Sequence, residues 1–187
     1  RVLFRSVPII SALRLISERL ANQARLYAVV LSKRGDQSAA AGFFEESIRI
    51  ARQSLELMNL QETLDRENSS NRRRSFVANL NLSTSLLCGG KPDDALGFLE
   101  TARAKMLEGR LADRDNRENL IDEIEVKKND LLLAMLRKDS AAANDLAMRG
   151  FEKTGALLKA DLTNQELMNF RSFFGETILR LAEKQPN

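Results

Sequence analysis

The sequence predicts an all-α protein made of paired antiparallel helices, about seven in all. Three prolines and nine glycines interrupt 187 residues, so the elements between them must be long. Aromatic residues make up only 5% of the chain, so its core must be mostly Leu, Ala, Ile and Phe, as in helix-on-helix packing. A helix–turn–helix pattern at residues 23–52 also recurs at 79–105 and, more loosely, at 127–153.

The first helix is expected over residues 7–34, with Pro8 in its first turn, where a missing N–H costs nothing. Gly35 ends this helix, and Asp36 is a good N-cap for a second helix that reaches about residue 65. Apolar residues at three- and four-residue steps form the expected inner face of the first helix. They are Ile9, Leu13, Ile16, Leu20, Ala24, Tyr27, Ala28 and Leu31.

The polar segment 66–74 (RENSSNRRR) is expected to be a loop. A third helix should follow over about 73–87 and end at Gly89-Gly90. A fourth should begin at Pro92, followed by two acids beside its positive end, and should stop at Gly109.

A fifth helix is expected over about 117–137, with an acidic first half and a basic middle that match the helix dipole. Asp139 or Ser140 should cap a sixth helix that extends to about residue 159. The segment 163–166 (TNQE) has the pattern of a capping box and should open the seventh.

Residues 7–184 are expected to form a single domain, since their number fits one domain of ordinary size. The first six residues, RVLFRS, are similar to translated sequencing adapters, so we expect residues 1–6 to be a non-native or disordered start and the chain to be a fragment. Residues 185–187 are expected to be a disordered tail.

The three copies of the hairpin pattern align on their turns. Gly35, Gly90 and Lys138 occupy the turn at intervals of 55 and 48 residues, and a small residue follows five positions later in each copy. Here the chain resembles the tetratricopeptide-repeat family. In that family each hairpin has a small residue, a turn residue, a second small residue and an aromatic residue at fixed positions. These positions hold Ala28, Gly35, Ala40 and Phe44, then Ser83, Gly90, Ala95 and Leu99, then Leu131, Lys138, Ala143 and Ala147.

The resemblance implies antiparallel hairpins stacked as an α-solenoid, in which each hairpin buries its apolar face against its neighbours. The spacing departs from the family, whose period is about 34 residues. The family's usual proline after the second helix is also missing. A generic helical bundle is the alternative fold.

No pattern in the chain indicates an enzyme, a cofactor or a metal site. The chain contains no histidine, so a His-based triad and His metal ligands are excluded. The single cysteine, Cys88, excludes an internal disulfide, leaves the compartment open and is interpreted as a small residue at a helix end. Paired acids such as Asp93-Asp94 point in different directions on a helix, which argues against a shared acid/base site.

The net charge of +3 is modest and does not favour nucleic-acid binding. The run Arg72–Arg74 lacks interleaved aromatic residues, so it is interpreted as a solvated helix start. No apolar run approaches the roughly 18 residues of a membrane-spanning helix.

The family resemblance implies a non-catalytic scaffold that binds a protein or peptide partner in a groove lined by the first helix of each hairpin. The alternative is a regulatory or ligand-sensing helical region of a larger signalling or transcription protein. An open apolar groove would favour the scaffold, and an enclosed cavity would favour ligand sensing. The resemblance places Asn22, Arg25, Val29, Lys33, Val77, Leu80, Thr84 and Lys128 in the groove.

Overall fold

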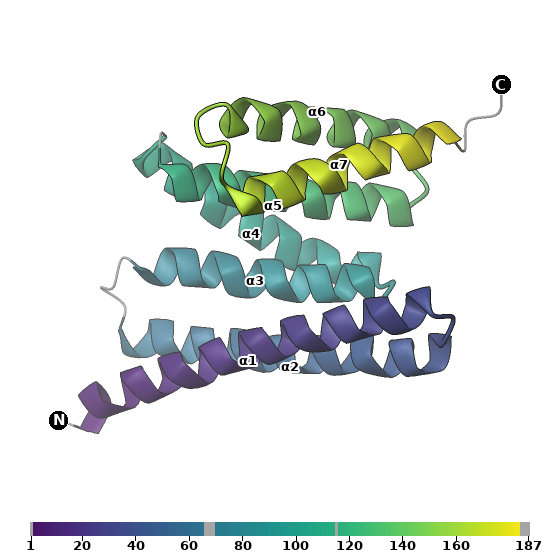
Figure 1. The fold of residues 1–187 in the computed structure, drawn as a ribbon. Helices are drawn as coiled ribbons and strands as arrows, with labels where there is room; N and C mark the ends of the chain where they lie inside the picture. Colours follow the sequence, from purple (N-terminus) through teal and green to yellow (C-terminus); the bar gives the residue numbers. More distant parts are fainter. Residues whose placement is uncertain (1, 66–69, 115, 184–187) are drawn as a thin grey trace. The chain divides into compact units, whose positions relative to one another are not determined.

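The structure is a computed structural model that describes residues 2–65, 70–114 and 116–183 (Figure 1). Within these ranges it contains seven α-helices and no β-strand, so the all-α prediction is confirmed. The helices are α1 (Val2–Lys33), α2 (Gln37–Leu64), α3 (Ser70–Cys88), α4 (Pro92–Ala112), α5 (Arg117–Leu136), α6 (Ser140–Leu158) and α7 (Gln165–Glu183).

The chain divides into two compact units, which are described separately: a first unit, Arg1–Gly109, and a second unit, Arg110–Asn187. In the first unit α1 packs along α2, α2 packs against α3, and α1 also touches α3. In the second unit α5 packs against α6 and α6 against α7. Packing in sequence order is consistent with a stack of helical repeats, while the prediction of one domain over 7–184 stays a prediction.

The three turns that align in the sequence share one backbone geometry. Gly35, Gly90 and Lys138 all have positive φ, at 86°, 73° and 59°. In each turn this residue donates its N–H to the carbonyl three positions earlier, and the next residue donates to the carbonyl five positions earlier, at 2.9–3.1 Å. This is the Schellman ending of a helix. The sequence alignment therefore identified three equivalent corners.

Small residues after each corner let the helices approach closely. Five positions on, Ala40, Ala95 and Ala143 are all buried. Twelve positions on, Ser47, Ala102 and Gly150 are buried as well. Asp36 and Asp139 each accept a backbone N–H three residues later at 3.0 Å, as N-caps do.

Several predicted boundaries are wrong. Helix α1 begins at Val2, so Pro8 lies inside it rather than in its first turn. Helix α3 begins at Ser70, which makes 70–74 helical rather than a loop. The buried Asn71 side chain donates to the Asp65 carbonyl at 2.6 Å and ties this first turn to the end of α2.

Two further boundaries differ. Helix α4 runs through Gly109 to Ala112, since a single glycine costs a helix only about 1 kcal/mol. Asn164, not Thr163, caps α7: its side-chain oxygen accepts the Leu167 N–H at 3.0 Å, while the Thr163 hydroxyl donates to Asp161. The predicted disordered tail lies outside the described residues.

Candidate protein-binding surface

Helix α1 directs most of its large apolar side chains away from α2. Ala24 and Ala28 are buried as predicted, but the larger members of the expected inner face are not. We call these side chains, together with Phe43 of α2, the outer face. Its α1 members are 48–62% exposed and comprise Ile9, Leu13, Ile16, Leu20 and Tyr27.

Apart from Ile10, the buried side of α1 is made of small and polar residues instead. Ala21 and Ala28 are almost completely buried, and the Ser47 hydroxyl of α2 donates to the Ala21 carbonyl at 2.9 Å. Alanine lets two helix backbones come this close, whereas leucine or tyrosine would hold them apart. We predicted that large apolar residues would form the inner face of α1. That prediction was wrong, because Ala21 and Ala28 are the residues that pack against α2.

An ion pair is also buried beneath the outer face. Arg14 and Glu18 pair on adjacent turns of α1, and the Ser54 hydroxyl of α2 lies 3.4 Å from the Glu18 carboxylate. Burial raises the pKa of Glu18, and the charge and hydrogen bond of Arg14 offset part of that rise. Polar groups thus occupy the inner side of a helix whose outer side is apolar.

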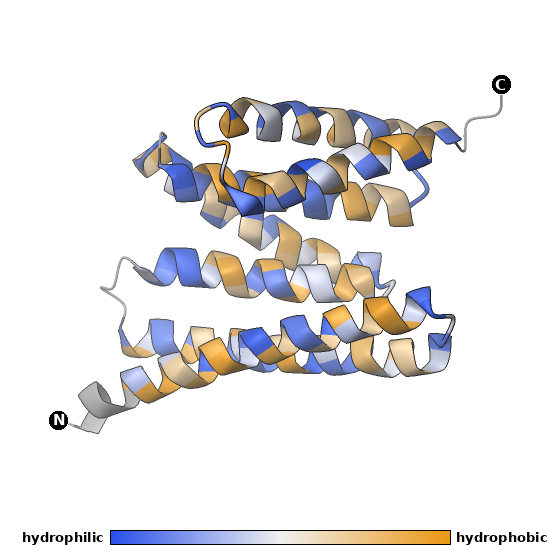
Figure 2. Cartoon of the chain, in the orientation of Figure 1, coloured by the Kyte–Doolittle hydropathy of each residue, from blue (hydrophilic) through white to orange (hydrophobic). Residues whose placement is uncertain are grey.

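The outer face continues onto α2 at one end. The ring of Tyr27 lies 5.9 Å from that of Phe43, centroid to centroid, and Phe43 is itself exposed. Figure 2 shows hydrophobic residues along much of the visible length of α1. Helices that are apolar on most sides are normally covered, and exposed apolar patches of this kind mark interaction sites.

The charges on the exposed side of α1 have one sign. Between residues 7 and 33 the only carboxylate is Glu18, which is buried with Arg14. Arg19 and Lys33 are exposed, and Arg25 is half-buried with a hydrogen bond to Asn22 at 2.8 Å. By helical spacing, Arg19 lies beside the outer face, Lys33 lies beyond its end, and Arg25 lies toward the side of α1 that packs on α2.

The residues predicted to line a groove are not all accessible. Asn22, Arg25, Val29 and Lys33 follow one another along α1 and are half-buried or exposed, so their contact with a partner stays a prediction.

The predicted lining residues of α3 and α5 have partners within the fold. In α3, Leu80 and Thr84 are only 5% and 8% exposed, so a partner cannot reach them in this structure. The Thr84 hydroxyl donates to the Leu80 carbonyl at 2.7 Å. Val77 is half-buried. In the second unit, Lys128 lies 5.7–5.8 Å from the ring centroids of Phe170 and Phe173.

Sequence reasoning missed the outer face, although a signal for it was present. Leu15, Leu26, Val29 and Val30 lie off the predicted inner face and are also exposed in the structure. Apolar residues therefore cover far more of the circumference of α1 than one packing face requires. Such an excess is typical of helices that are covered on more than one side.

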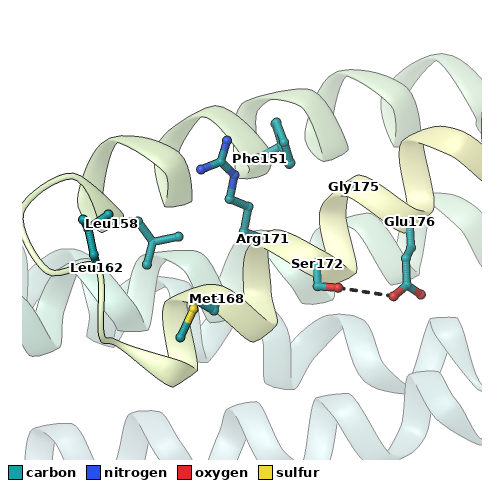
Figure 3. A pocket seen from close by; sticks show the side chains of 8 residues that line it. All are labelled: Phe151, Leu158, Leu162, Met168, Arg171, Ser172, Gly175 and Glu176. Atoms are coloured by element: carbon teal, nitrogen blue, oxygen red, sulfur yellow. Dashed lines mark hydrogen bonds between the residues drawn. The ribbon is translucent and has the colours of Figure 1, made fainter.

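The second unit contains an open pocket of about 510 Å³ between α6 and α7 (Figure 3). The guanidinium of Arg171 lies 4.6 Å from the ring centroid of Phe151, and the Ser172 hydroxyl donates to Glu176 at 3.3 Å. The remaining lining is mostly apolar. It consists of Leu158, Leu162, Met168 and Gly175.

Two other features bear on function. Among the described residues no three His, Cys, Asp or Glu side chains gather closely enough to hold a metal ion. Of the helices in the described ranges, none has the length and apolar character needed to cross a bilayer.

Comparisons of the chain with models of known protein families, with curated proteins and with solved structures find no match. The function must therefore be inferred from the geometry and chemistry of the chain.

Proposed function

We propose that this chain is a non-catalytic protein–protein interaction scaffold built from helical hairpins similar to tetratricopeptide repeats. The observation that carries the proposal is the outer face: six large apolar side chains of one hairpin are exposed in a row that a partner can cover. The three equivalent corners support the comparison with repeat proteins, which commonly present extended binding surfaces.

The energetics suit reversible binding. Covering the exposed half of a leucine or isoleucine gains about 1 kcal/mol, so the outer face supplies about 6 kcal/mol. Association itself costs about 4–15 kcal/mol in lost freedom of motion. Apolar contact alone therefore gives weak binding, and the polar groups beside the outer face decide which partner is held.

The second candidate function is ligand sensing. The pocket between α6 and α7 favours it, because a volume of about 510 Å³ is typical of small-molecule sites. The pocket is open to solvent, whereas a sensing domain encloses its ligand, so the scaffold is the better-supported function.

The proposal is tested by capture from a lysate of the source cells. A Leu13→Ser/Leu20→Ser double variant should lose the proteins that the unchanged chain retains. Leu107→Ser is the matched control, since Leu107 of α4 is 55% exposed but lies outside the outer face. Retention of the same proteins by the double variant, with its circular dichroism unchanged, would contradict the proposal.

A further inference from the structure

We propose that the outer face binds an amphipathic α-helix of a partner protein that carries acidic residues beside its apolar side. This inference rests on the proposed function and names the partner's chemistry. Three properties of the face lead to it: its shape, its charge and its poor fit to a second copy of the chain.

The shape of the outer face suits a helix. Its α1 members follow steps of four, three, four and seven residues, which keep them on one side of the helix. From Ile9 to Tyr27 the row is about 27 Å long at 1.5 Å per residue. An apolar row of this length matches about five turns of a second helix packed along α1.

The charge beside the row is positive. Arg19 is exposed beside the row and Lys33 is exposed beyond its end, while the carboxylate of Glu18 is buried with Arg14. On α2, Glu46 accepts two hydrogen bonds from Arg49, at 2.8 and 2.5 Å, so its charge is already matched. A partner with glutamate or aspartate beside its apolar side therefore complements α1.

A second copy of the chain fits this surface poorly. Two-fold antiparallel pairing of the row with itself centres on residue 18, midway between Ile9 and Tyr27, which brings the exposed Arg19 of each copy toward the other. Like charges brought together in this way oppose association. A bilayer surface is also a poor match, because interfacial helices keep a strongly charged side in water, whereas α1 buries Arg14 and Glu18 against α2.

The test uses two synthetic helices of about 20 residues with identical leucine positions. One carries glutamate beside the leucines, and the other carries lysine at the same positions. Fluorescence anisotropy at low ionic strength should show the acidic helix binding at least about tenfold more tightly, with the difference shrinking in high salt. Equal affinities, or tighter binding of the lysine helix, would overturn the proposal.

Two sets of variants separate this proposal from the proposed function. Arg19→Glu/Lys33→Glu should reverse the preference between the two helices, and Leu13→Ser/Leu20→Ser should abolish binding of both. If both helices bind equally and the leucine variant loses both, the face is a docking site but the acidic preference is wrong. If neither helix binds, both this proposal and the assignment of the docking surface fail.

Two further measurements identify the competing occupants. Sedimentation that shows a dimer of the unchanged chain, lost in the leucine variant, would assign the face to a second copy. Binding to vesicles of phosphatidylcholine and phosphatidylserine, also lost in that variant, would assign it to a membrane. Either result overturns the acidic-helix proposal. A chain that is monomeric and does not bind the vesicles supports it.

Discussion

Lys138 occupies the corner position that glycine holds in the other two repeats. Its φ of 59° lies in the left-handed region, which costs a residue with a Cβ about 1 kcal/mol relative to glycine. Lys138→Gly should therefore stabilise the second unit by about that amount in urea unfolding. Gly35→Ala is the reciprocal control and should destabilise the first unit. A neutral or negative effect of Lys138→Gly would show that its corner is not strained.

Gly150 is needed because α6 lies against a buried ring. A Cβ added there would clash with the Phe174 ring, which is fully buried. Gly150→Ala should therefore destabilise the fold by about 1–3 kcal/mol through overpacking. In α4, Gly97 has open space around it, so Gly97→Ala should stabilise its helix by about 0.5–1 kcal/mol. Thermal unfolding that ranks the two variants in the opposite order would contradict this packing.

At the scale of elements, Glu123 of α5 joins three segments of the second unit. Its carboxylate pairs with Lys153 of α6, Arg110 at the end of α4 and Lys127 of its own helix. Partial burial alone would raise the pKa of Glu123, but the hydrogen bond and charge of Lys153 and the charges of Arg110 and Lys127 hold it below its ordinary 4.5.

The lowered pKa of Glu123 gives its stabilising effect a defined pH dependence. Because the unfolded chain binds this proton more readily, the contribution is present above 4.5 and is lost as the pH falls through the folded-state pKa. Glu123→Gln should therefore lower the urea midpoint at neutral pH, and the deficit should shrink on acidification. A deficit that does not change with pH would show that the carboxylate charge is not what stabilises these contacts.

The positions of the helices could be predicted from the sequence, but not the side that each helix buries. Periodicity and capping residues together predicted the seven helices, and the corner residues predicted the ends of α1, α3 and α5, because glycine and N-cap preferences act locally. The orientation of α1 was not predictable in the same way. One stripe of α1 contains Leu13 and Leu20 and another contains Ala21 and Ala28, and both repeat at helical spacing. Which of the two stripes faces α2 depends on how closely the two helices approach. That distance is set by tertiary packing and not by the local sequence.

At the scale of the whole molecule, the recurring corner could be located from the sequence, whereas the position of the outer face could not. A corner can be recognised in the sequence because its backbone geometry depends on only a few adjacent residues. A surface depends on which side of each helix its neighbours leave uncovered. Leu80 and Thr84 were assigned to the groove by resemblance, yet both are buried. The outer face emerged only when the packing of α1 on α2 was known.

Helix α1 presents most of its large apolar residues to solvent and, as we propose, to a partner. Thiol labelling of Leu20→Cys and Ala28→Cys variants, each combined with Cys88→Ser, tests it most directly. The thiol at position 20 should react at least about tenfold faster than the one at position 28, because only the first lies on an exposed side. Adding the acidic synthetic helix should slow labelling at position 20 alone. Faster labelling at position 28, or no protection at position 20, would contradict the account.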